Sequence, residues 1–127
     1  MNMNPYEAYR KQDLETCNNQ ELVSKLFNEA SVSLRRAVHA IDVKKYDVAN
    51  DNIKKSQIIV NTLDKSLDMQ YEISGQLRNL YTYMSKRMLE ANMKKDSTIL
   101  NEISEMLSGL RDTWTEAVKR SKRTQSM

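Results

Sequence analysis

Side chains able to do acid–base, nucleophilic or metal chemistry are few in this sequence. It contains one histidine, His39, and one cysteine, Cys17. A di-iron helical site needs paired Glu-x-x-His motifs, which a single histidine cannot supply. A glycine-rich phosphate loop is also missing, since the chain has two glycines. A Cys–His pair stays geometrically open, but nothing in the spacing favours it. We therefore expect a protein that is not an enzyme, with no catalytic residue, metal or cofactor.

Adaptable apolar side chains are present in excess instead. The 127 residues include eight methionines and six tyrosines. Methionine repacks around different shapes at low cost, and tyrosine offers a rigid ring with a polar tip. Such residues fill an irregular core or line a groove that binds an amphipathic peptide. We expect a partner-binding groove drawn from the following set, some members of which must be core: Ile58, Ile59, Tyr71, Leu77, Tyr81, Met84 and Met88.

Most of this set falls on one long helix, predicted from Glu72 to Lys95. Its apolar residues recur at steps of three and four, which is the spacing of one helical face. That face is predicted to be buried and comprises Ile73, Leu77, Leu80, Tyr81, Met84, Met88 and Ala91. Tyr71, Leu89 and Met93 fall on roughly the opposite side. A helix with apolar groups on two sides is either central in its fold or offers a second surface to a partner.

Three more helices follow from the same spacing. They are predicted over residues 18–40, 47–67 and 97–120. Asp47 or a neighbouring residue is the expected N-terminal cap of the second helix, and Asp96 that of the last helix. Phe27 falls at the margin of the first helix's core stripe, whereas Ala117 belongs to the face of the last helix.

Four helices with short links and one apolar stripe each predict an all-α, antiparallel four-helix bundle over residues 18–120. Residues 1–17 are expected to form an N-terminal arm, or strap, or a short extra helix. Pro5 would start a turn that places Tyr6 and Tyr9 on one side, as two anchors for an apolar surface. Residues 121–127 are expected to be a basic, flexible tail.

Charge and hydropathy narrow the class of partner. The net charge is +3, and acidic and basic residues alternate along the chain. This arrangement is typical of a solvated surface, so nucleic-acid binding is not expected, although the basic cluster of residues 119–123 leaves it as an alternative. No apolar run approaches the roughly 20 residues of a membrane span, and residues 1–11 lack the hydrophobic core of a signal peptide. We expect a protein of the cytosol.

Several short motifs, taken together, resemble one family. Each is weak alone, but their order and spacing from Asn4 to Ala117 are specific. They are Asn4-Pro5-Tyr6 with Ala8-Tyr9, Asn52-Ile53 with Gln57, Gln76-Leu77 with Leu80-Tyr81-x-Tyr83-Met84, Glu90-Ala91-Asn92, and Arg111-Asp112-x-Trp114. The pattern is similar to that of the FliS family, the cytosolic export chaperones of flagellin.

The resemblance implies a function that composition cannot give. Members of that family bind the C-terminal segment of flagellin, prevent its premature polymerisation and assist flagellar type III secretion. It also implies that the arm bearing Tyr6 and Tyr9 packs on the bundle and is rearranged when flagellin binds. Two alternatives stay open: a helical adaptor for another flagellar export factor, and association of two copies through exposed faces.

Overall fold

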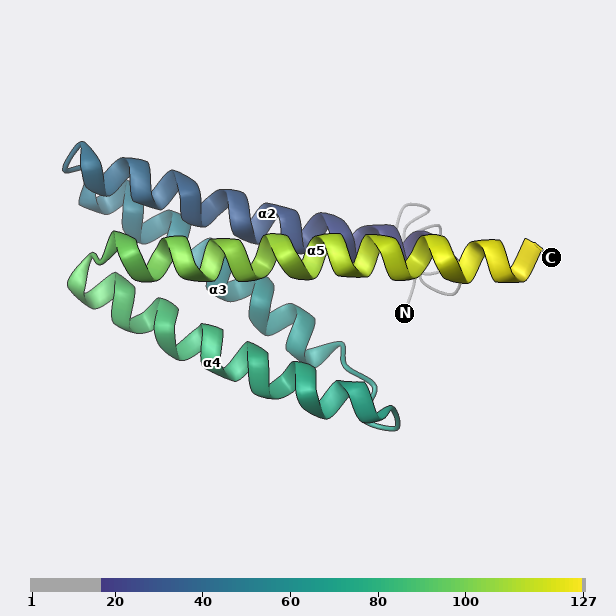
Figure 1. Ribbon diagram of the computed structural model, residues 1–127. Helices are drawn as coiled ribbons and strands as arrows, with labels where there is room; N and C mark the ends of the chain where they lie inside the picture. The colour runs from purple at the N-terminus through teal and green to yellow at the C-terminus, as the bar shows by residue number, and fades with distance from the viewer. Residues whose placement is uncertain (1–16, 127) are drawn as a thin grey trace, which may run out of the picture.

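The computed structural model describes the backbone of residues 17–126 and the side chains of residues 20–121. Within this part of the chain four helices follow one another (Figure 1): α2 (Cys17–Asp42), α3 (Tyr46–Lys65), α4 (Glu72–Lys94) and α5 (Ser97–Ser126). No strand occurs among the described residues. The predicted all-α class is confirmed. The predicted arm, with Tyr6 and Tyr9, lies outside the described residues.

Successive helices run in opposite directions, which gives the predicted antiparallel bundle (Figure 1). Helix α2 packs against α3 and α5, and α4 also packs against these two but through smaller interfaces. The C-terminal end of α4 lies beside the start of α5, whereas its N-terminal end lies away from α5 together with the end of α3 (Figure 1). Helix α4 is therefore the least enclosed helix of the four.

The helix boundaries agree with the predicted ones to within a few residues, with one exception. Helix α5 continues to Ser126, beyond the expected end at residue 120. The prediction that Asp47 or a neighbour caps α3 with its side chain is wrong: the N-cap residue is Lys45, which makes no side-chain cap, and Asp47 already lies in the first turn of α3. The cap by Asp96 is confirmed: its carboxylate Oδ1 accepts hydrogen bonds from the backbone N–H groups of Thr98 at 3.0 Å and Ile99 at 3.3 Å.

A lysine with positive φ ends each of two helices. Lys44, which follows α2, has φ 61°, and Lys95, which follows α4, has φ 50°. At the first site the backbone N–H of Lys45 donates to the carbonyl of Ala40 at 2.8 Å, and that of Lys44 donates to the carbonyl of Ile41 at 2.9 Å. This is the Schellman pattern, which satisfies the last carbonyls of a helix and reverses the chain at once.

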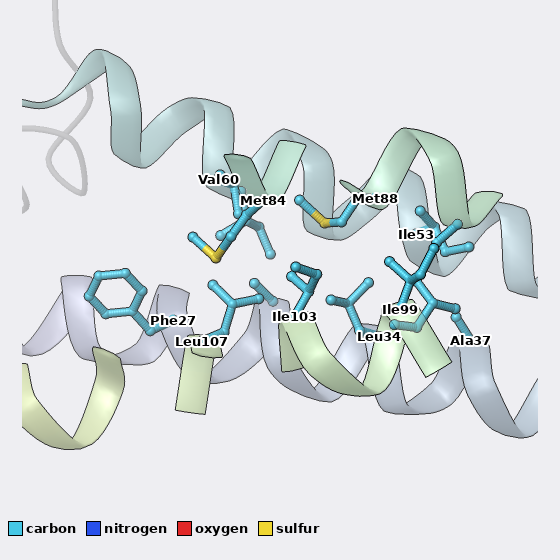
Figure 2. Close-up of a cluster of buried hydrophobic side chains, with 14 of the residues drawn as sticks. Phe27, Leu34, Ala37, Ile53, Val60, Met84, Met88, Ile99, Ile103 and Leu107 are labelled. Atoms are coloured by element: carbon cyan, nitrogen blue, oxygen red, sulfur yellow. The ribbon is translucent and has the colours of Figure 1, made fainter. Parts of the chain in front are cut away.

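Side chains from all four helices meet in one core (Figure 2). Leu34 from α2, Met84 and Met88 from α4 and Ile103 from α5 are fully buried, and Ile53 and Val60 from α3 close the cluster. Small residues are buried among them, which lets α2 approach its neighbours closely: Ala30, Ser31, Ser33, Ala37, Ala40, Ala49, Ser56 and Ser104. The core therefore combines close contacts around α2 with flexible methionines under α4.

Three expected positions are corrected. Phe27 is not marginal but buried, and its ring lies 6.5 Å from that of Tyr81. Ile73 was expected in the core but is 56% exposed, because the N-terminal end of α4 lies away from α5 (Figure 1). Ala117 is exposed, since α5 extends beyond the part of the bundle that α4 covers. Helical spacing identifies a face, but not how far along the helix a neighbour covers it.

Buried serines provide a matched pair of stability tests. Ser31 Oγ lies 2.9 Å from Ser104 Oγ and 2.7 Å from Ser108 Oγ, across the α2–α5 interface. Ser33 Oγ, also buried on α2, has no hydrogen-bond partner among the described residues. We expect Ser31→Ala to lower the free energy of unfolding by about 1–3 kcal/mol, and Ser33→Ala to leave it unchanged or raise it. Urea denaturation of both variants measures the difference, and equal losses would contradict it.

The glycine in the middle of α5 gives a prediction of the opposite sign. A β-carbon added at Gly109 would meet no atom within 4 Å, and the residue is exposed with an ordinary helical φ. Glycine costs a helix roughly 1 kcal/mol relative to alanine. We expect Gly109→Ala to raise the free energy of unfolding by about 0.5–1 kcal/mol. Thermal unfolding followed by circular dichroism checks this, and a lowered midpoint would mean that another surface needs the space.

Candidate functional site

The predicted groove residues separate into core and surface. Met84 and Met88 are fully buried, Tyr81 is 3% exposed, and Ile59 is at the edge of burial. All of them belong to the hydrophobic core shown in part in Figure 2. In this conformation they cannot contact a partner, because they are buried in the core. Their part in the candidate site is to pack α3 and α4 onto the rest of the bundle.

Three members of the set remain accessible. Ile58 on α3 is 66% exposed, and Tyr71, at the start of α4, is 65% exposed. Leu77 is half-buried and packs against the core. Tyr71 lies in the α3–α4 corner beside exposed Met69, so this corner has apolar side chains of its own.

Ile58 belongs to a groove between the outer sides of α3 and α4. The groove has a volume of about 490 Å³. Its lining, which we call the α3–α4 groove, is Lys54, Gln57, Ile58, Asn61, Ser85 and Leu89. Leu89 is 56% exposed, and Met93, one turn further along α4, is also exposed. Three large apolar side chains therefore lie on one accessible side of the α3–α4 pair.

Polar contacts between α3 and α4 hold this groove in shape. Arg78 Nε donates to Asp64 Oδ1 at 3.1 Å, and the same guanidinium reaches the Asp64 backbone carbonyl at 3.3 Å. Toward the other end of the helices, Asn92 Nδ2 donates to Asn50 Oδ1 at 2.8 Å. Because the helices are antiparallel, these contacts lie on either side of Ile58 and Leu89 along the pair. The groove is thus a preformed surface supported by the core.

The opposite side of α4 carries a polar link to α5. The Tyr83 hydroxyl donates to Glu102 Oε1 at 2.7 Å, and Arg87 lies between Glu102 and Glu90. The hydrogen bond to Glu102 raises the pKa of the Tyr83 phenol. Burial, with a smaller effect of the Asp64 carboxylate, raises the pKa of Tyr81 to about 12. Both tyrosines therefore stay neutral at physiological pH, one as part of the core and one as a surface link.

Leu89 and Met93 were not among the predicted groove residues. Their position opposite the buried face of α4 was evident from helical spacing. That spacing could not pair them with Ile58, which lies on another helix. Their exposure, together with the shared groove, is what assigns Leu89 to the candidate site and places Met93 beside it.

The groove offers apolar contact and hydrogen bonding, not chemistry. No group of three or more histidine, cysteine, aspartate or glutamate side chains among the described residues could hold a metal ion. No described helix combines the length and hydropathy needed to cross a bilayer. The groove's one charged residue is Lys54, and its floor is aliphatic. A partner bound there would be an amphipathic segment that presents an apolar face.

The chain is similar to known proteins of one family. The model of one protein family, described as "Flagellar protein FliS", matches residues 2–121. The chain is 32% identical over 116 residues to the flagellar secretion chaperone FliS of Bacillus subtilis (strain 168), covering 91% of this chain and 87% of that protein. It is 30% identical over 99 residues to the flagellar secretion chaperone FliS of Salmonella typhimurium, covering 76% and 73% of the two chains.

Proposed function

The chain belongs to the FliS family of flagellar proteins, and from that premise we propose that it is a flagellar export chaperone whose client is flagellin. The segment it holds is the C-terminal segment of newly made flagellin. The place of action is the cytosol, before export. The observation that carries the proposal is the family match over residues 2–121, and the exposed α3–α4 groove supports it.

The proposed mechanism is stoichiometric masking. The flagellin segment lays an apolar face against Ile58 and Leu89, with Met93 and Tyr71 extending the contact along α4. Covering that face removes it from association with other flagellin molecules, and mass action then keeps flagellin unassembled. The predicted arm residues Tyr6 and Tyr9 remain part of this proposal as contacts that client binding would rearrange.

Calorimetric titration of the full chain with a synthetic flagellin C-terminal segment tests the proposal. We expect saturable one-to-one binding. The heat-capacity change should be negative, because apolar surface is buried, and the affinity should change little with salt. An equimolar peptide from another part of flagellin is the control. The absence of binding to the C-terminal segment would overturn the flagellin assignment and favour an adaptor for another export factor.

A further inference from the structure

A second groove lies near the corner where α2 ends and α3 begins. The helices meet in this corner at the upper left of Figure 1. Its volume is about 590 Å³, larger than that of the α3–α4 groove. We call it the α2–α3 corner groove, and it is lined by Val32, Arg35, Arg36, His39, Ala40, Val43, Lys45, Val48 and Asn52. It shares no lining residue with the α3–α4 groove, and Val48 is ten residues, or about 15 Å, from Ile58 along α3.

The floor of this groove is aliphatic and accessible. Val43, just after α2, and Val48, in the first turns of α3, are each about half exposed. Ala40 is buried beneath them, and Val32 is half-buried. Val43 and Val48 are not part of the core, so the corner holds apolar surface that the described helices leave uncovered.

Three basic residues on the rim, Arg35, Arg36 and Lys45, distinguish this groove from the α3–α4 groove. None of the described residues that line it is acidic. Arg36 Nη1 lies 3.8 Å from Glu29 Oε1, but Arg35 and Lys45 have no carboxylate within salt-bridge distance among the described residues. Two cations beside an apolar floor are therefore free to meet the carboxylates of a partner.

We infer that the α2–α3 corner groove is a second docking site, which binds an amphipathic segment of another protein whose apolar side chains are flanked by carboxylates. Its apolar residues would cover Val43 and Val48. Its carboxylates would pair with Arg35, which can bind them through two parallel hydrogen bonds, and with Lys45. Since the groove is separate from the α3–α4 groove, this segment and the flagellin segment would bind together.

Synthetic peptides and the full chain labelled with nitrogen-15 test the inference. The probe is a helical peptide with leucines on one face and glutamates on either side of them. One analogue replaces every glutamate with lysine, and another replaces every leucine with serine. We expect the probe to shift the amide resonances of Val43, Val48 and Asn52, and each analogue to bind at least about tenfold more weakly by fluorescence anisotropy. Affinity should fall as salt is raised.

Charge reversal supplies the matched control. Arg35→Glu with Lys45→Glu should weaken probe binding by about tenfold or more. Lys65→Glu with Lys86→Glu makes the same change in net charge on exposed positions outside both grooves and should leave the affinity unchanged. Equal losses in the two double variants would overturn the inference, because the binding would then depend on overall charge.

Three other outcomes would also overturn it. Resonance shifts confined to Ile58 and Leu89 would place the probe in the α3–α4 groove. Displacement of the probe by a flagellin C-terminal segment would make the corner part of the client site. Self-association of the unlabelled chain in analytical ultracentrifugation, abolished by Arg35→Glu with Lys45→Glu, would assign the corner to a second copy of this chain.

Discussion

Tyr81→Ala is expected to lower the free energy of unfolding by about 3–4 kcal/mol, among the largest effects of any single substitution on α4. The Tyr81 side chain is 3% exposed, and its ring packs 6.5 Å from that of Phe27, so truncation removes a ring shared by α2 and α4. Helix α4 has small interfaces, so little can collapse into the cavity from that side. Urea denaturation monitored by circular dichroism measures the loss.

Tyr71 provides the control for this substitution. It carries the same side chain at the start of the same helix, but it is 65% exposed. Tyr71→Ala should change the free energy of unfolding by no more than about 0.5 kcal/mol. If the two variants lose the same stability, Tyr81 does not join α4 to α2 as described. Weaker flagellin binding by Tyr81→Ala would not identify Tyr81 as a contact residue, because the variant is also expected to lose stability. Tyr81→Phe keeps the ring, so it separates an effect on flagellin binding from an effect on the free energy of unfolding.

Ile58→Asp combined with Leu89→Asp is expected to weaken binding of the flagellin C-terminal segment by about 30-fold or more. Each substitution places a charge where the proposed client lays an apolar face, and two contacts that contribute about 1 kcal/mol each give this factor. Both side chains are more than half exposed, so the free energy of unfolding should change little. Calorimetric titration measures the affinity.

Val43→Asp combined with Val48→Asp is the matched control. It removes two aliphatic side chains of similar exposure and makes the same change in charge, but in the α2–α3 corner groove. Flagellin-segment affinity should stay within about twofold of the unmodified chain. A similar loss in both double variants would show that flagellin contacts both faces. No loss in the Ile58 and Leu89 variant would exclude the α3–α4 groove as the client site.

Much of the fold could be predicted because helical periodicity is a local property. The steps of three and four residues located all four helices, and Asp96 marked the start of the last one. The turn before α3 was less predictable, because Lys44 takes a left-handed conformation that its residue type does not indicate. Glycine would have marked such a turn, and lysine does not.

The candidate site was less predictable for a related reason. Met84 and Met88 have the residue type of an adaptable binding surface, yet they are fully buried. Leu89, next to Met88 in sequence, is exposed in a groove with Ile58. Residue type indicated that the chain has apolar side chains suited to a partner, but not which of them the other helices would cover.

By itself, the sequence determined the number of helices, their approximate ends, the apolar face of each and the likeness to a family of flagellar proteins. Only the tertiary structure decided which apolar residues are left for a partner. The face of the helix on which a residue lies follows from the few residues before and after it in sequence. Its burial depends on where a neighbouring helix lies. Helix α4 diverges from α5 toward its N-terminal end, so Ile73 is exposed there while Met84, further along the same helix, is buried. That divergence results from packing across the whole bundle.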